Sequence, residues 1–148
     1  MALYFLDTSA LVKLYVQEPG TDRLLYLTGD QLENRFAVLA ISMVELRSAI
    51  RRRQRAGDIE AGVASAVLEN VQRHMESRFL RQAVNDTVID TALGIIDRHA
   101  LRAYDAIQLA GCLVIGGTAA EPFTFVCSDH RLLEAARSEQ LKVFDPTA

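Results

Sequence analysis

The segment Leu3-Tyr4-Phe5-Leu6-Asp7 consists of four apolar residues followed directly by a carboxylate. A short, continuous apolar run is typical of a strand that is buried on both faces, as in a parallel sheet. The runs Phe36–Ile41, Phe79–Val84 and Phe123–Cys127 have the same character, and Lys142–Phe144 is a shorter one. The sequence therefore predicts several strands of one buried parallel sheet.

Segments with helical periodicity separate these strands. We expect helices over Ser9–Val16, Thr21–Thr28, Ser42 to Gly57, Ile59–Met75 with Asp58 as its cap, Asp86–His99, Ala106–Ile115 with Gly116-Gly117 as its stop, and His130–Glu139. Strands that alternate with helices form a parallel sheet covered on both faces. We therefore predict one three-layer α/β domain over residues 1–148.

The composition limits the class of protein. With 50% hydrophobic residues, 8 Gly and 3 Pro, the chain can bury a core, which excludes disordered and collagen-like proteins. The longest weakly polar run, Leu109–Ala120, is too short for a membrane span, and Asp7 interrupts the apolar start before a secretory signal can form. Cys112 and Cys127 form no CxxC pair. We expect a soluble cytoplasmic protein with no membrane contact.

Four carboxylates occupy comparable places in this pattern. Asp7 closes the first strand, Glu45 lies one turn into the helix after the second, Asp105 begins an apolar helix, and Asp129 follows a later strand. Ligands of open parallel sheets bind beyond the carboxyl ends of the strands, so we expect the four to converge. Hard oxygen donors without clustered His or Cys favour Mg²⁺ or Mn²⁺ over zinc.

Each acid also has a structural interpretation as a helix cap. Asp7 or Ser9 can cap the first helix, and Ser128 or Asp129 can cap the last one, because Asp and Ser are both preferred caps. The segment Ser42-Met43-Val44-Glu45 fits the Ser-x-x-Glu capping box, and the pair Asp105 and Gln108 has a similar form. Ser and Thr cap helices as well as Asp does, so four caps do not require an acid at every point. The pattern as a whole favours a shared site.

Four motifs resemble those of PIN-domain proteins, in particular the VapC-type toxins. They are Leu3–Tyr15 around Asp7-Thr8-Ser9, Ile41–Leu46, Tyr104–Ala110 and Val126–Leu133, in the order that the family has them. The resemblance implies an α/β/α fold with a five-stranded parallel sheet. It also implies a divalent-metal-dependent ribonuclease, commonly the dimeric toxin of a toxin–antitoxin pair.

The resemblance assigns roles to individual residues. The implied catalytic and metal-binding residues are Asp7, Glu45, Asp105 and Asp129. Thr8 and Ser128 match the small polar residues that steady such carboxylates or a metal-bound water. Many relatives have a further acid where this chain has Arg131. A second metal site would therefore have one carboxylate ligand fewer in this chain. The number of metal ions, one or two, stays open.

A basic helix face accompanies the second acid. Arg47, Arg51 and Arg55 are spaced so that they share one face of a helix. One interpretation is a contact with RNA phosphates beside Glu45; the alternative is a solvated face or an anchor for an acidic partner segment. Setting the four acids aside changes the net charge from −3 to +1, so the remaining surface can accept a polyanion.

The leading hypothesis is an endoribonuclease toxin in which a metal-activated water attacks an RNA phosphodiester and a small antitoxin protein neutralises the enzyme. One alternative is a PIN nuclease of RNA processing without an antitoxin. Another is a non-catalytic domain of the same fold that binds proteins. The absence of one of the four acids would have favoured that alternative, and all four are present. An aspartyl-phosphate phosphatase needs an Asp-x-Asp pattern, which Asp7-Thr8-Ser9 lacks.

Overall fold

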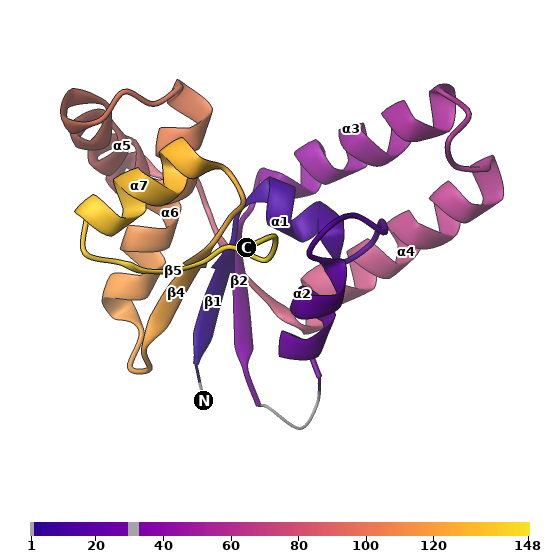
Figure 1. Ribbon diagram of the computed structural model, residues 1–148, viewed down its shortest axis with the longest axis horizontal. Helices are drawn as coiled ribbons and strands as arrows, with labels where there is room; N and C mark the ends of the chain where they lie inside the picture. The colour runs from indigo at the N-terminus through magenta and orange to yellow at the C-terminus, as the bar shows by residue number, and fades with distance from the viewer. Residues whose placement is uncertain (1, 30–32) are drawn as a thin grey trace.

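The structure is a computed structural model that describes residues 2–29 and 33–148. Strands and helices alternate along the chain (Figure 1): β1 (Leu3–Leu6), α1 (Thr8–Lys13), α2 (Thr21–Leu27), β2 (Arg35–Leu39), α3 (Ser42–Arg55), α4 (Ala61–Ser77), β3 (Phe79–Gln82), α5 (Asp86–Arg98), α6 (Ala103–Thr118), β4 (Phe123–Val126), α7 (His130–Ser138) and β5 (Lys142–Phe144). The predicted α/β class and all of the expected strands are confirmed.

The five strands form one parallel sheet in the order β3-β2-β1-β4-β5. Leu3 of β1 lies opposite Arg35 of β2 and Phe123 of β4. The chain builds the sheet outward from β1 through β2 and β3, and then crosses back through α5 and α6 to place β4 on the other side of β1. The strand order thus reverses between β1 and β4, and such a reversal is where open parallel sheets bind ligands.

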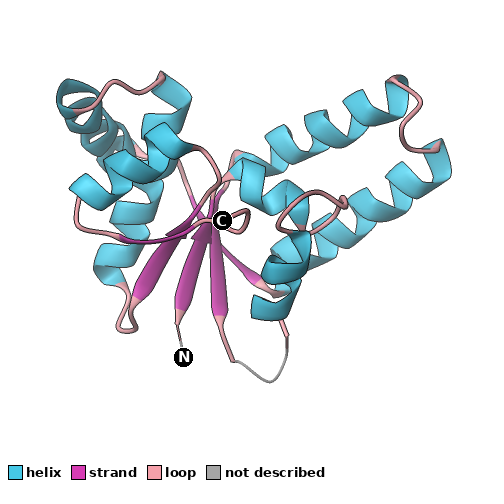
Figure 2. Cartoon of the chain, viewed as in Figure 1, coloured by secondary structure: helices cyan, strands magenta, loops and turns pink. Residues whose placement is uncertain are grey.

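Two layers of helices cover the sheet (Figures 1 and 2). Leu3 and Phe5 of β1 face α5, α6 and α7, whereas Leu6 faces the layer of α1 to α4. The first layer is filled by Val88, Ile95, Leu109 and Leu132, and the second by Leu11, Leu46, Ile50 and Leu68. This alternation of side chains on each strand confirms the predicted three-layer α/β/α architecture.

Two predicted helix signals are wrong. Asp58 caps nothing, because α4 begins at Ala61 after an extended Glu60. Gly116 does not stop α6, which continues to Thr118. A Cβ on Gly116 would lie 2.2 Å from Cε2 of Phe123, so this glycine lets β4 approach the helix closely.

The helices α3 and α4 pack against each other and project from the sheet as an arm (Figure 1). Their sheet-proximal ends cover β2 and β3, and their far ends meet at the turn around Gly57, whose φ of +82° suits glycine. Among the described helices, none has the length and apolar character needed to cross a membrane.

Candidate active site

Asp7 lies at the point where the strand order reverses. Its backbone N–H donates to the carbonyl of Val126 at 3.1 Å, which ties the end of β1 to the end of β4. Its carboxylate caps α1 by accepting from the Ala10 N–H at 2.8 Å, and it accepts from the Ser9 hydroxyl at 2.8 and 3.0 Å. The side chain is only 6% exposed, so its orientation is fixed from several directions.

Burial raises the pKa of Asp7 from its usual 3.8 to about 6. This value already includes the negative charges of Asp105 and Asp129, which act in the same direction as burial, and the hydrogen bonds from Ala10 and Ser9, which oppose the rise. The structure therefore places three carboxylates, which are far apart in the sequence, within one another's electrostatic field.

Asp105 and Asp129 reach this place from two different helices. Asp129 caps α7 by accepting from the Leu132 N–H at 3.0 Å, and Asp105 lies in the first turn of α6. Burial and the charge of Asp129 raise the pKa of Asp105, and the guanidinium of Arg102 opposes the rise. A cavity of about 720 Å³ is lined by both acids together with Arg102 and Arg131.

Glu45 is not in this set. It lies in the first turn of α3 and is exposed, and its carboxylate makes no hydrogen bond or ion pair with any residue that the structure describes. It is also absent from the charges that raise the pKa of Asp7. The structure thus brings together Asp7, Asp105 and Asp129, three of the four carboxylates expected to converge, whereas Glu45 is solvent-exposed and does not act on Asp7.

The capping interpretation is correct for two acids and wrong for the other two. Asp7 and Asp129 cap helices and still face the shared site, so one carboxylate serves both purposes. No capping box forms at Glu45, because α3 begins at Ser42 after Ile41 without a side-chain cap. Asp105 lies inside α6, which begins at Ala103, and therefore caps nothing.

A buried hydrogen-bond cluster lies beneath the acids and joins the segments that carry them. The amide nitrogen of Gln108, a side chain only 2% exposed, lies 3.0 Å from each of the hydroxyls of Thr8, Ser42 and Tyr104. The Thr8 hydroxyl also donates to Ser42 at 2.9 Å. We call these four residues the Gln108 cluster.

The Gln108 cluster fixes three chain segments relative to one another. Thr8 follows the first acid, Ser42 begins the helix of Glu45, and Tyr104 precedes Asp105. The Oε1 atom of Gln108 is buried and has no hydrogen-bond partner within the described part of the chain. Sequence analysis considered Gln108 only as a capping partner; its position as the one long polar side chain within the apolar face of α6 was the available signal.

The remaining predicted site residues lie around this centre. The Thr8 hydroxyl belongs to the Gln108 cluster, and Ser9, which sequence analysis treated only as a possible cap, contacts the Asp7 carboxylate. Ser128 follows β4 and is half-buried, and its hydroxyl lies close enough to the carboxylate of Asp145 to help lower the pKa of that group.

The three arginines of the predicted basic face lie along α3. Arg51 donates to the Oε1 atom of Gln54 at 2.7 Å, whereas Arg47 and Arg55 are exposed. Because α3 projects from the sheet, Arg47 is the one nearest the acids and Arg55 lies toward the far end of the arm (Figure 1).

The chemistry of the acidic site fits a hard divalent cation. Carboxylates are preferred ligands of Mg²⁺ and Mn²⁺, and a bound cation would offset the mutual repulsion that adds to burial in raising the pKa of Asp7 and Asp105. Within residues 2–29 and 33–148, no three His, Cys, Asp or Glu side chains already surround a metal-sized position. The donors thus suit the ion, and small side-chain adjustments of exposed Asp129 and half-buried Asp105 would be part of binding it.

Comparison with known proteins gives concordant results. The chain is 34% identical over 145 residues to ribonuclease VapC35 of Mycobacterium tuberculosis, and the alignment covers 97% of both chains. Its fold is similar to that of VapBC2 from Rickettsia felis bound to a promoter DNA fragment, with a TM-score of 0.67, 13% identity and coverage of 97% and 98%. It is also similar to a toxin–antitoxin complex from Klebsiella pneumoniae, with a TM-score of 0.64, 16% identity and coverage of 99% and 98%.

The family model described as the PIN domain matches residues 4–138, which include Asp7 at the end of β1, Asp105 in α6 and the cap of α7 at Asp129. The match thus spans every element that contributes to the acidic site. Because both this match and the identity to a curated relative extend over nearly the whole chain, the protein belongs to the PIN domain family.

Proposed function

We propose that this protein is a divalent-metal-dependent endoribonuclease and the toxin of a toxin–antitoxin pair. The observation that carries the proposal is the convergence of Asp7, Asp105 and Asp129 where the strand order reverses, with the pKa of Asp7 raised to about 6. The relative in Mycobacterium tuberculosis is a ribonuclease, and the related folds include a toxin–antitoxin complex, which supports the same assignment.

The three converging carboxylates would hold Mg²⁺ or Mn²⁺. When bound, such an ion lowers the pKa of a water molecule and stabilises the charge that develops on a phosphoryl oxygen. The chain's own contribution is orientation: the Ala10 N–H and the Ser9 hydroxyl hold the Asp7 carboxylate, and the Leu132 N–H holds that of Asp129. Preorganised ligands of this kind avoid reorganisation during the reaction.

The other predicted residues complete the proposed site. Glu45 is free to turn and to accept a proton from the attacking water, because its carboxylate has no other partner among the described residues. Ser128 would bond to a ligand or a water beside Asp129, and Thr8 acts through the Gln108 cluster. Arg47, with Arg51 and Arg55 farther along α3, would contact RNA phosphates.

The activity is tested by incubating total RNA with the purified chain in Mg²⁺, in Mn²⁺ and in EDTA. We expect cleavage only with a metal ion, and none by the Asp7→Asn variant, which retains a good helix cap. Asp90→Asn is the matched control, because Asp90 is exposed on α5, outside the acidic site. Cleavage by Asp7→Asn at the wild-type rate would refute the assignment.

The toxin assignment is tested in cells. Expression of the wild-type chain without a partner should arrest growth through cleavage of cytoplasmic RNA, whereas Asp7→Asn should be tolerated. A small antitoxin protein encoded beside the gene should restore growth by binding the toxin. We also expect the toxin itself to form a homodimer. Unimpaired growth with folded, abundant wild-type protein would contradict the toxin role and leave a nuclease of RNA processing.

A further inference from the structure

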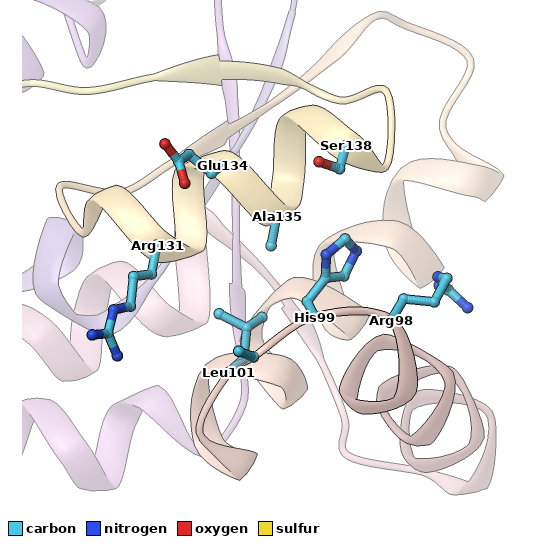
Figure 3. Close-up of a pocket in the computed structure, with 8 residues that line it drawn as sticks. Arg98, His99, Leu101, Arg131, Glu134, Ala135 and Ser138 are labelled. Carbon is cyan, nitrogen blue, oxygen red and sulfur yellow. The ribbon is translucent and has the colours of Figure 1, made fainter.

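A second cavity, of about 480 Å³, lies between α7 and the segment that joins α5 to α6 (Figure 3). Ala100, Leu101 and Arg131 line both this cavity and the one that contains Asp105 and Asp129. The two cavities are therefore adjacent, with these three residues between them. We call the second one the α7 trough; a chain molecule held at the acids can extend into it without leaving the protein surface.

The α7 trough combines an apolar wall with a buried polar atom. Leu101 and Ala135 form apolar parts of its lining, and His99 and Ser138 also line it (Figure 3). The Nε2 atom of His99 is buried and has no hydrogen-bond partner among the described residues; Oε1 of Glu139, at 3.6 Å, is too far for one. An occupant of the trough therefore meets the rest of the His99 ring, which lines the cavity, rather than this buried atom.

Positive charge is concentrated where the trough meets the acidic site. Arg131 lines both cavities, and neither it nor Arg102 forms a hydrogen bond or an ion pair with a described residue. Arg98, at the other end, is already paired with Glu139. The free guanidinium groups therefore lie beside the acids, where the planar fork of an arginine can bind a phosphate.

We propose that the α7 trough binds one nucleotide of single-stranded RNA, adjacent to the phosphodiester held at Asp7, Asp105 and Asp129. Arg131 contacts the phosphate between the two cavities, and the base packs on Leu101 beside the ring of His99. A base can enter such a cavity only when it is splayed out of a helix, which favours a single strand. This inference rests on the proposed ribonuclease function and adds a nucleotide subsite to it.

Binding of RNA is measured in the Asp7→Asn background, where no cleavage is expected. The probe is a fluorescein-labelled single-stranded RNA of mixed sequence, followed by fluorescence anisotropy over a series of KCl concentrations with Mg²⁺ present. We expect Arg131→Ala to weaken binding and to reduce the slope of log affinity against log salt by about 0.7, the loss of one phosphate contact. Arg137→Ala is the matched control: Arg137 is exposed on the same helix and lines neither cavity.

His99 is tested separately because it contributes no phosphate contact. His99→Leu keeps a side chain of similar size and removes the polar ring that lines the trough, so the affinity should fall about fivefold with the salt slope unchanged. His99→Gln should recover part of the affinity. Thermal unfolding of each variant shows whether it is folded, and Arg131→Ala tests the trough without altering a buried side chain.

The outcomes separate the trough from the proposed function. If wild-type protein cleaves no RNA but the background variant binds it with the expected dependence on Arg131 and His99, the trough stands and the nuclease assignment fails. If Arg131→Ala and His99→Leu both bind RNA as the Arg137→Ala control does, the trough holds only water or a segment of a protein partner, and the inference is wrong. Absence of RNA binding by the background variant also overturns it.

Discussion

Replacing Asp7 with Asn should stabilise the metal-free protein at neutral pH while abolishing cleavage. The buried carboxylate has a pKa of about 6 in the folded protein, against 3.8 when it is solvated. The variant retains the cap, since an Asn side chain can accept the Ala10 N–H in place of the carboxylate. The substitution therefore removes a negative charge and leaves the local structure unchanged.

The magnitude follows from the difference in pKa. A difference of about two pH units corresponds to about 3 kcal/mol of folding free energy at 1.36 kcal/mol per unit. The hydrogen bonds from Ala10 and Ser9 already contribute to the pKa of about 6, so they need no separate correction. Nearly complete burial of Asp7 means that solvent screening reduces the figure little.

The sign depends on pH in a defined way. Folding raises the pKa of Asp7, so the folded state binds its proton more tightly than the unfolded state does. The stability that this group contributes is complete below the unfolded pKa of 3.8 and is lost as the pH rises through about 6. Asn carries no charge at any of these pH values. The advantage of the variant should thus be near zero at the acidic end and approach about 3 kcal/mol above the folded pKa.

Urea denaturation in EDTA, followed by far-ultraviolet circular dichroism across this pH range, measures the difference. Asp90→Asn, an exposed change of the same kind on α5, is the control and should show no such pH-dependent gain. Added Mg²⁺ should then stabilise the wild type more than Asp7→Asn, because a ligand of the native state shifts unfolding by mass action. An Asp7→Asn advantage that is absent, or equal at every pH, would refute the electrostatic reasoning and leave Asp7 as a cap alone.

Two further substitutions test packing around the site. Gln108→Leu should lower the free energy of unfolding by about 1–3 kcal/mol and reduce cleavage, because Thr8 and Ser42 lose their common donor. Urea titration measures the stability and the RNA assay measures the cleavage. Unchanged values in both would show that the Gln108 cluster is dispensable. Gly116→Ala should destabilise the fold by about 1–3 kcal/mol, because the new side chain would clash with Phe123. Gly117→Ala is the control and should be neutral or slightly stabilising, because a Cβ there meets no atom within 4 Å. Equal effects of the two changes on the melting temperature would contradict the close approach of β4 to α6.

The sheet and its helices were predictable because their signals are local. A strand buried on both faces must be apolar throughout, which Phe36–Ile41 and Phe123–Cys127 satisfy, and alternation with helices then dictates parallel strands. Helix ends were less predictable, since they depend on packing between distant segments. Gly116 illustrates this: nothing near it in the sequence shows that the ring of Phe123 will occupy the space a side chain would need.

The site was predictable where backbone topology alone determines it. Asp7 and Asp129 follow β1 and β4, which are neighbours in the sheet, so any chain with this strand order brings them together. Glu45 differs because it lies a full turn inside α3, where the helix phase and the side-chain rotamer decide its direction. Neither is encoded by strand order. The same holds for the α7 trough, whose lining comes from two helices and a connecting segment.

The Gln108 cluster explains how a fold can tolerate carboxylates that repel one another. Repulsion among Asp7, Asp105 and Asp129, which adds to the effect of burial on the pKa of Asp7, favours separation of the segments that carry them. Directly beneath, a buried amide bonds to hydroxyls from two of these segments and from the start of α3. Hydrogen bonds are electrostatically stronger in such a low-dielectric interior, and water cannot easily replace them there. The polar cluster therefore opposes the electrostatic strain above it, and the acids can converge before any cation is bound.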